Sequence, residues 1–340
     1  MIEPLNALII FGLVATIVAL VFFPTYGLFS RWKRNRRKMK RAVIEDALKH
    51  VFDCEYKNIF CTTESIAGSL LLSTDEAAKL LTLLSTMGLL VTFDNGVKLT
   101  AEGRSYALRI IRIHRLWERY LADETSVPPT EWHSSAELAE HKLTAAEVET
   151  LAAQIGNPNF DPHGDPIPTP SGEIPPKKGH SLLSLKSGEF ADITHIEDEP
   201  EAVYAQLIAQ GLYVGMQVMM IERSNEHVRF AADGKDIVLA PLLTNNVTVA
   251  PITEEEKRIT SPLESLASLK IGEEATVLSI SKAMRGQQRR RLMDLGVVPG
   301  TPIRAEMKSA TGDPTAYNIR GALVALRQQH ATMIFIQKNI

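Results

Sequence analysis

The chain has 340 residues, of which 45% are hydrophobic and 23% are charged, so its composition excludes wholesale disorder and leaves room for two or three folded domains. Its net charge is −3, but residues 31–41 carry eight basic side chains, so the remainder is acidic and poorly suited to non-specific nucleic-acid binding. Two cysteines, Cys54 and Cys61, exclude a disulfide framework and match no zinc-knuckle or redox spacing, so we expect them to be buried in a reducing compartment.

The N-terminal segment predicts a membrane anchor. Residues 5–23 contain no charge, and as a helix they would reach about 28 Å, close to the thickness of a bilayer core. An acidic start with Glu3 and no small-residue cleavage site favour retention over removal as a signal peptide. The basic run at 31–41 then predicts a single-pass protein of the inner (cytoplasmic) membrane, with everything that follows in the cytoplasm. The same run suits anionic lipid headgroups.

Residues 31–100 predict a basic juxtamembrane segment followed by a winged helix-turn-helix. Apolar periodicity near 44–52, a short helix, and a third helix opened by the capping box Ser73–Glu76 precede a hairpin at Asn95-Gly96. The pattern is also found in small protein-binding modules, so it does not by itself establish DNA binding.

Residues 101–156 predict a helical domain. A long helix covers 101–121, a second holds the segment WHSSAELAEHKL, and a third starts at the capping box Thr144–Glu147. The stretch 157–179 is rich in proline and glycine and is expected to be a linker.

The C-terminal part contains an internal repeat. SLKSGEFADITHI, starting at Ser184, matches SLKIGEEATVLSI, starting at Ser268, at an offset of 84 residues. Alternating apolar residues and short turns predict a small β-barrel at 180–255 and another at 262–340. The fold class is therefore α+β and multidomain, with a transmembrane helix at residues 1–30.

Two of the predicted helices carry side chains at metal-ligand spacing. On the later helix, four such residues fall within about 100° of one face, and on the earlier helix two lie one turn apart. These residues are His133, Glu137, Glu140 and His141, and His114 and Glu118. Their oxygen and nitrogen donors suit manganese, iron(II), cobalt or zinc. Solvated charges on amphipathic helices are the alternative interpretation.

Residues 38 to about 170 resemble the diphtheria toxin repressor family of iron- and manganese-dependent regulators. The likeness is carried by IIRIHRLWERYL, WHSSAELAEH and NPNFDPHGDPIP, in that order and spacing. It implies a dimer held by the helical domain, an Fe(II) or Mn(II) cofactor, and two metal sites. The primary site would use Asp46, Glu137, Glu140 and His141, and the ancillary site His114, Glu118 and His133.

Details of the resemblance bear on how many ions bind. Asp46 and Glu137 match the manganese-sensing branch, in which His114 would serve the primary cluster and a glutamate would replace Lys49. The Lys49 ammonium, one turn from Asp46, would repel a second cation unless it points to solvent, so one ion or two stays open.

The two repeats resemble the SH3-like domains of the same family, and the second copy more closely resembles the FeoA domain of bacterial ferrous iron uptake. RRRLMDLGVVPGTPI and LVALRQQHATMIFI carry the second likeness. In some family members an acidic loop of the first SH3-like domain adds ancillary ligands, which makes Glu197, Asp198 and Glu199 candidates here.

DNA binding is less clearly indicated than metal binding. Lys79 is the single basic residue between 62 and 88, and Asp75 and Glu76 open the expected recognition helix, where phosphate would repel them. The candidate DNA contacts are Ser73, Thr74, Lys79 and Lys98. One hypothesis is a membrane-anchored, metal-dependent transcriptional regulator; the other is a metal-sensing accessory subunit of a ferrous iron permease. No nucleophile motif or phosphate loop indicates an enzyme.

Overall fold

The computed structural model describes residues 28–340 except 94–95, 178, 234, 254–263 and 339–340. The chain divides into two compact units, Met1–Ile111 and Arg112–Ile340, and the boundary falls within helix α5 (Ala101–Glu124). No helix in the described part is both long and apolar enough to span a bilayer. The predicted span at 5–23 lies outside the described residues.

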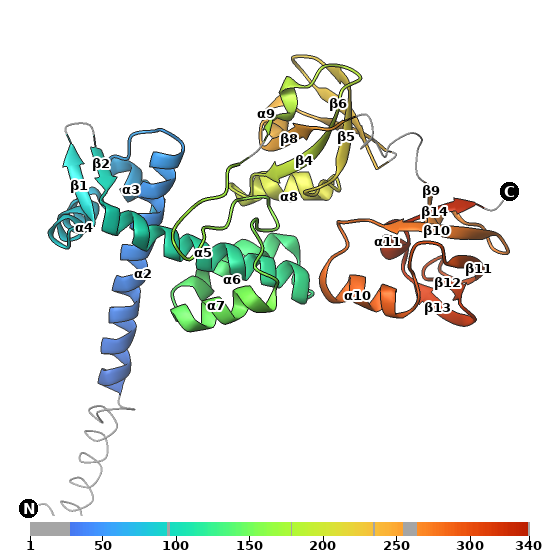
Figure 1. The fold of residues 1–340 in the computed structure, drawn as a ribbon, viewed down its shortest axis with the longest axis horizontal. Coiled ribbons are helices and arrows are strands. Elements are labelled where there is room, and N and C mark those ends of the chain that lie inside the picture. The colour runs from blue at the N-terminus through green and yellow to red at the C-terminus, as the bar shows by residue number, and fades with distance from the viewer. Residues whose placement is uncertain (1–27, 94–95, 178, 234, 254–263, 339–340) are drawn as a thin grey trace, which may run out of the picture. The chain divides into compact units, whose positions relative to one another are not determined.

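The first unit has the element order expected of a winged helix (Figure 1). Its elements are α2 (Leu28–Tyr56), α3 (Thr63–Ser69), α4 (Thr74–Thr86), and a hairpin of β1 (Leu90–Phe93) and β2 (Gly96–Leu99). The predicted capping box is present at the start of α4, because Ser73 and Glu76 each accept a backbone hydrogen bond from the other. Leu90 pairs with Leu99 in the hairpin register.

The core of the first unit forms between α2 and the shorter helices. Leu48 of α2, Ile66 of α3 and Leu84 of α4 are fully buried. Glu45 is also fully buried, and its Oε1 accepts hydrogen bonds from Arg41 Nε and the Tyr106 hydroxyl, both at 2.7 Å. These partners offset the cost of removing a carboxylate from water.

The helical part of the second unit consists of the end of α5, the short η1 (Pro129–Glu131), α6 (Trp132–Glu140) and α7 (Ala145–Gln154). The capping box predicted at Thr144–Glu147 is present at the start of α7. The stretch 157–179 is more than the expected linker. Its described residues form no helix or strand, but Asp161, His163 and Ile167 are at most 3% exposed.

Two antiparallel sheets of six strands follow, each folded around its own core. The first has the order β3-β8-β4-β5-β6-β7, with β3 (His180–Ser181), β4 (Phe190–Ile196), β5 (Gln217–Arg223), β6 (Val228–Ala232), β7 (Lys235–Leu239) and β8 (Val247–Pro251). The second has the order β13-β12-β11-β10-β14-β9, with β9 (Glu264–Ser265), β10 (Glu274–Ile280), β11 (Pro302–Lys308), β12 (Thr315–Ile319), β13 (Ala322–Leu326) and β14 (Ile334–Lys338).

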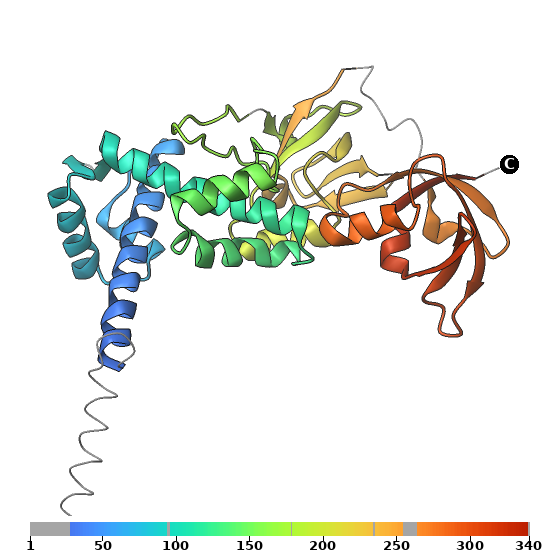
Figure 2. The same ribbon diagram turned by 60° about the horizontal axis from the view of Figure 1, so that its bottom comes forward.

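Helices and short turns join these strands. They are η2 (Leu182–Ser184), α8 (Glu201–Ala209) and α9 (Pro241–Thr244) in the first copy, and η4 (Leu266–Ser268), α10 (Gly286–Asp294) and α11 (Gln328–Ala331) in the second. Figures 1 and 2 show one longer helix with each sheet, yellow α8 in the first copy and orange α10 in the second.

The repeat expected from the sequence extends to irregular details of the sheets. The pairing of β4 with β8 shifts register between Ile193 and His195, and that of β10 with β14 shifts at the equivalent positions Val277 and Ser279. Since such bulges locally disrupt pairing and add twist, their recurrence shows that the two copies share one backbone design.

Candidate metal centre

Two helices of the second unit bring three predicted ligands together. His114 and Glu118 lie one turn apart on α5, and Nε2 of His114 is 3.1 Å from Oε1 of Glu118. His133, in the first turn of α6, places Nδ1 3.6 Å from the same Glu118 oxygen. One ligand atom from each of the three residues lies within 4.8 Å of the others, so they can reach a single ion.

A loop between the helices and the first sheet adds a histidine that the sequence analysis did not select. Asp161 Oδ1 accepts hydrogen bonds from the backbone N–H groups of His163 and Asp165, each at 2.9 Å, which folds the loop into a tight turn. The His163 carbonyl accepts a hydrogen bond from Ile196 N at 2.9 Å, so the loop is attached to the end of β4. The turn holds the His163 ring against Trp132 and Tyr204.

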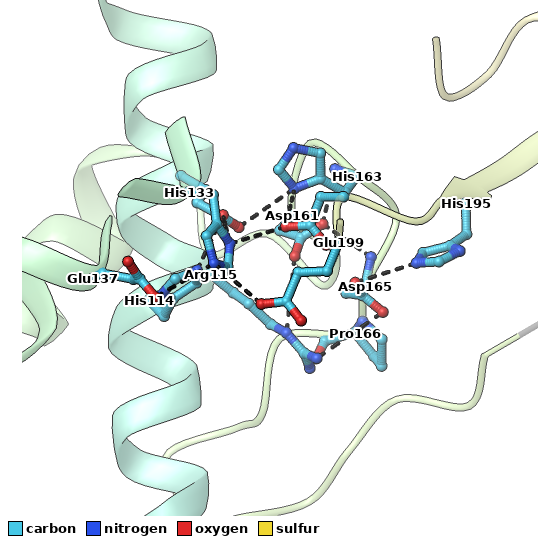
Figure 3. A network of polar contacts seen from close by, with 12 residues as sticks. His114, Arg115, His133, Glu137, Asp161, His163, Asp165, Pro166, His195 and Glu199 are labelled. Atoms are coloured by element: carbon cyan, nitrogen blue, oxygen red, sulfur yellow. Dashed lines mark hydrogen bonds and ion pairs between the residues drawn. The ribbon is translucent and has the colours of Figure 1, made fainter. Parts of the chain in front are cut away.

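Loop residues after β4 complete the cluster. Asp198 Oδ2 lies 3.0 Å from His133 Nδ1 and 3.6 Å from His163 Nδ1, and Glu199 Oε1 lies 3.3 Å from His133 Nε2. Figure 3 shows His133, His163 and Glu199 converging from helix, turn and loop. Glu118, His163 and Asp198 form a second group of three possible ligands within 4.8 Å, sharing Glu118 with the first.

The three acidic candidates of this loop differ in where they lie. Asp198 and Glu199 both lie close to His133, and their role as ligands stays a prediction. Glu197 belongs to neither three-ligand group, and its backbone N–H donates to the Asn246 carbonyl at 2.9 Å. A role for Glu197 as a ligand therefore stays a prediction.

His163 offers the most direct indication that a cation belongs in this cluster. The residue is 2% exposed, and neither ring nitrogen has a hydrogen-bond partner among the described residues. Its Nδ1 instead faces two carboxylates, at 3.5 Å from Glu118 Oε2 and 3.6 Å from Asp198 Oδ2. A buried imidazole that lacks hydrogen bonds yet points at carboxylates fits a metal ligand better than a structural role.

The electrostatics of the cluster follow from burying several carboxylates among histidines. Burial would raise the pKa of Glu118, but the His114 and His163 rings hold it well below its usual range. Burial would lower the pKa of His163, but Glu118 and Asp161 raise it to about 9. Burial raises the pKa of Asp161 to about 8, with Asp165 and Glu118 adding to the effect. Without a metal, protons therefore neutralise this acidic cluster.

A second layer of contacts orients the turn that carries His163. Asp165 Oδ2 lies 3.2 Å from His195 Nε2, and Arg115 Nη1 donates to the Pro166 carbonyl at 2.6 Å. Arg115 Nε is also 3.8 Å from Asp161 Oδ2. Burial would raise the pKa of Asp165, but His195 and Arg115 lower it, so this carboxylate stays ionised.

The residues of the predicted primary site do not all lie in one unit. His114 Nδ1 is 2.6 Å from Glu140 Oε2, and His141 Nε2 is 3.6 Å from Glu140 Oε1, so these three are neighbours. Glu137 is exposed and faces His133 instead, with Oε1 3.6 Å from its Nε2. Asp46 lies on α2 of the first unit, and its place in the same site stays a prediction.

The predicted DNA contacts are exposed on the first unit. Thr74 and Lys79 lie on α4, and Lys98 lies on β2 with its ammonium 5.4 Å from the centre of the Phe93 ring. Ser73 is the N-cap of α4, where its hydroxyl hydrogen-bonds Glu76. Capping of the helix is sufficient to account for a serine at this position, so Ser73 need not contact DNA. Thr74, Lys79 and Lys98 are exposed to solvent and are accessible to DNA.

Two protein families match separate parts of the chain. Residues 100–169 match the iron dependent repressor, metal binding and dimerisation domain, and residues 264–338 match the FeoA domain. The first match covers both helices of the cluster and the turn that holds His163. Part of the stretch expected to be a linker therefore belongs to the metal-binding domain of that family.

Curated relatives are repressors and a transport protein. The iron-dependent repressor IdeR of Mycobacterium bovis is 32% identical over 122 residues, 36% of this chain and 53% of its own length. The diphtheria toxin repressor of Corynebacterium glutamicum is 25% identical over 217 residues, 60% of this chain and 94% of its own. A probable metal transport system membrane protein of Chlamydia trachomatis is 37% identical over 86 residues, 25% of this chain but only 19% of its own length. None of these three bears the name of an enzyme.

Solved structures of metal-dependent repressors are similar over most of the described chain. A manganese-dependent transcriptional repressor in complex with manganese aligns with a TM-score of 0.56 at 25% identity, covering 62% of this chain and all of the other. The repressor ScaR with bound Zn²⁺ aligns with a TM-score of 0.53 at 26% identity, covering 62% and 99%. Together with the two domain matches, these similarities show that the chain is similar to diphtheria toxin repressor-like regulators, with an iron dependent repressor metal binding and dimerisation domain at residues 100–169 and a FeoA domain at residues 264–338.

Proposed function

We propose that this chain is a metal-dependent transcriptional regulator that takes Fe(II) or Mn(II) and binds DNA as a dimer while anchored in the inner membrane. The observation that carries the proposal is the cluster of Glu118, His133, His163 and Asp198, in which a buried imidazole without a hydrogen bond to any described residue faces two carboxylates. Imidazole and carboxylate donors without thiolate suit these ions.

The bound cation would supply positive charge where the chain concentrates negative charge. His133 and Glu118 come from helices, His163 from the turn at 161–165, and Asp198 from the loop after β4. An ion bound by ligands from the helices, the turn and the loop would connect the helical domain to the first SH3-like domain. Loading would thereby reduce the freedom of the domain expected to form the dimer, which is how metal would control output.

Metal binding is tested by calorimetry on the full chain under anaerobic conditions with Mn(II) and Fe(II). We expect Glu118→Gln to weaken binding strongly, because Glu118 belongs to both three-ligand groups. Glu140→Ala and His141→Ala test the predicted primary site. Exposed Glu147, which caps α7, gives the control Glu147→Gln. Wild-type affinity in the Glu118, Glu140 and His141 variants would contradict the site.

DNA binding is tested with the metal-loaded chain and a fragment from upstream of its own gene. Specific, metal-dependent binding that weakens with salt supports the regulator. Lys79→Ala and Lys98→Ala should each reduce affinity, since both side chains are exposed on the first unit. Binding that is equal with and without metal would contradict a metal-dependent regulator.

The second candidate is a metal-sensing accessory subunit of a ferrous iron permease. The FeoA domain at 264–338 and the acidic start of α4, where Asp75 and Glu76 stand, favour it. It predicts metal-dependent co-purification of a permease with the full chain and not with a chain ending at residue 253, alongside no specific DNA binding.

A further inference from the structure

The first unit contains both cysteines, and they are close together. Cys54 lies near the end of α2 and is 1% exposed. Cys61, 3% exposed, lies in the segment before α3 and pairs with Val97 of β2 in an isolated bridge. Both are free thiols, and both are buried, as the sequence predicted.

A histidine completes the group in a way that the spacing of the cysteines did not indicate. His50 precedes Cys54 by one helical turn, so the two side chains share a face of α2. His50 Nε2 lies 3.7 Å from Cys54 Sγ and 2.5 Å from the Ser65 hydroxyl of α3. One ligand atom from each of His50, Cys54 and Cys61 lies within 4.8 Å of the others.

The separation of these atoms fits a tetrahedral ion. With zinc bonds of about 2.3 Å to sulfur and about 2.0–2.1 Å to nitrogen, sulfur and nitrogen on one tetrahedral zinc stand roughly 3.6 Å apart. The observed distance of 3.7 Å between Cys54 Sγ and His50 Nε2 is close to that value. The distance between the imidazole nitrogen and the sulfur is therefore compatible with both atoms binding the same ion.

Two plainer explanations account for less. Cysteines that serve only as small apolar residues have no need of an imidazole nitrogen directed at them. A disulfide between Cys54 and Cys61 would not account for the position of the His50 imidazole beside Cys54.

We propose that His50, Cys54 and Cys61 form a separate site for a thiophilic divalent cation, with Zn(II) as the representative ion. These three residues would hold the ion, and water would supply the remaining ligand. Binding converts the two thiols to thiolates and releases their protons to solvent. The ion would join α2 to the segment that pairs with β2, fixing the winged-helix unit independently of the Fe(II) or Mn(II) site.

The wing gives this attachment a direct structural meaning. Val97 N donates to the Cys61 carbonyl at 3.0 Å, and a Cβ at Gly96 would lie 2.3 Å from the same oxygen. The backbone at Cys61 thus packs tightly on the start of β2. Holding the Cys61 side chain on an ion fixed to α2 would limit the movement of the wing relative to α2.

Cobalt(II) substitution tests the proposal on the full chain, reduced and anaerobic in mild detergent. Cobalt bound to thiolate gives an intense near-ultraviolet charge-transfer band, which the carboxylate and imidazole cluster cannot give. We expect the band in the wild type, its bleaching on addition of Zn(II), and its loss in Cys54→Ser and Cys61→Ser. Glu118→Gln should keep the band at wild-type strength, which separates this test from failure of the proposed function.

A thermal-unfolding measurement guards against misfolded variants. Zn(II) should raise the melting temperature of the wild type more than that of a folded Cys54→Ser, Cys61→Ser double variant, because the variant keeps the carboxylate and imidazole cluster, which can also take zinc, but lacks the thiolate site. His50→Ala should weaken cobalt binding at least about tenfold, as expected for loss of an imidazole ligand. No thiolate band in the fully reduced wild type, a band that survives in both cysteine variants, or a Cys54–Cys61 disulfide isolated from cells would each overturn the proposal.

Discussion

His163 is the residue on which the metal centre makes its sharpest prediction. Its ring is buried, without a hydrogen bond to the described part of the chain, and directed at Glu118 and Asp198. We expect His163→Ala to lower the affinity for Mn(II) at least about tenfold, the scale seen when support of a metal site is lost. Calorimetry measures the change, with His227→Ala, in the turn between β5 and β6, as the matched histidine control. Equal loss in both variants would point to a general effect on folding.

The same residue predicts how metal affinity depends on pH. In the metal-free chain Glu118 and Asp161 raise the pKa of His163 to about 9, so the ring is protonated at pH 7 and must release its proton to bind a cation. Apparent affinity should therefore rise with pH, by up to about tenfold per unit for each proton released, and level off above about pH 9. Calorimetry in buffers of different ionisation enthalpy measures the protons released. An affinity that falls between pH 6 and 8 would exclude this mechanism.

At the residue level, local spacing indicated which candidate ligands on the helices lie close together, but it did not select His163 in the loop. His114 and Glu118 share a face because they are one turn apart, and His133 joins them because α5 and α6 are neighbours. His163 belongs to a proline- and glycine-rich stretch without periodicity. Its position depends on the turn made by Asp161 and on the hydrogen bond to β4, and neither can be derived from spacing.

Among the connecting elements, the turn at 161–165 contains a glycine, Gly164, whose substitution should have a specific effect. Gly164 has φ +93°, and a Cβ there would lie 2.0 Å from the Thr194 carbonyl oxygen on β4. We expect Gly164→Ala to lower the free energy of unfolding by about 1–3 kcal/mol and to weaken metal binding, because the turn must move away from β4.

Gly188 provides a matched control for this substitution. Its φ is +83°, but a Cβ would meet nothing within 4 Å, so Gly188→Ala carries the backbone strain without the collision. Chemical denaturation of both variants, with calorimetry for the metal, separates the two effects. Equal destabilisation with unchanged metal affinity would show that close packing of the turn on β4 is not needed.

Elements with strong local signals were predicted closely, and those defined by tertiary contacts were not. The capping boxes at Ser73 and Thr144 begin α4 and α7, because cap and partner lie three residues apart in sequence. The repeat predicted two copies whose strands even share their bulges. The stretch 157–179 was expected to be a linker from its composition, yet Ile167 is 2% exposed, because burial there depends on distant partners.

At the scale of the whole molecule, the two copies of the β domain differ in sequence at the residues of the candidate metal centre. The first copy has His195 at the bulge of β4 and Asp198 in the following loop, and both contribute to the centre or its support. The equivalent of His195 in the second copy is Ser279. Since a serine there cannot replace the imidazole, we expect the second copy not to repeat the metal centre of the first.

Dimerisation is a whole-molecule property that the family relationship leads us to expect. We predict that the metal-loaded full chain is a dimer at micromolar concentration, through the helices between about 101 and 155. Sedimentation in matched detergent, with and without Mn(II), measures the state. The variant Glu118→Gln should shift the population toward monomer if the metal centre supports the dimer. A wild-type monomer with metal bound would contradict the prediction.

The last prediction concerns the expected membrane anchor, which depends on both the apolar segment at 5–23 and the basic segment at 31–41. Residues 5–23 carry no charge and residues 31–41 carry eight basic side chains, a pattern that predicts a membrane anchor with the following domains in the cytoplasm. We expect deletion of residues 1–30 to move the chain from the membrane to the soluble fraction while Mn(II) affinity stays at the wild-type level, because every ligand discussed lies beyond residue 40. Fractionation with calorimetry tests both parts. A full-length chain recovered in the soluble fraction would exclude the anchor, and loss of metal binding on deletion would mean that the anchor also shapes the site.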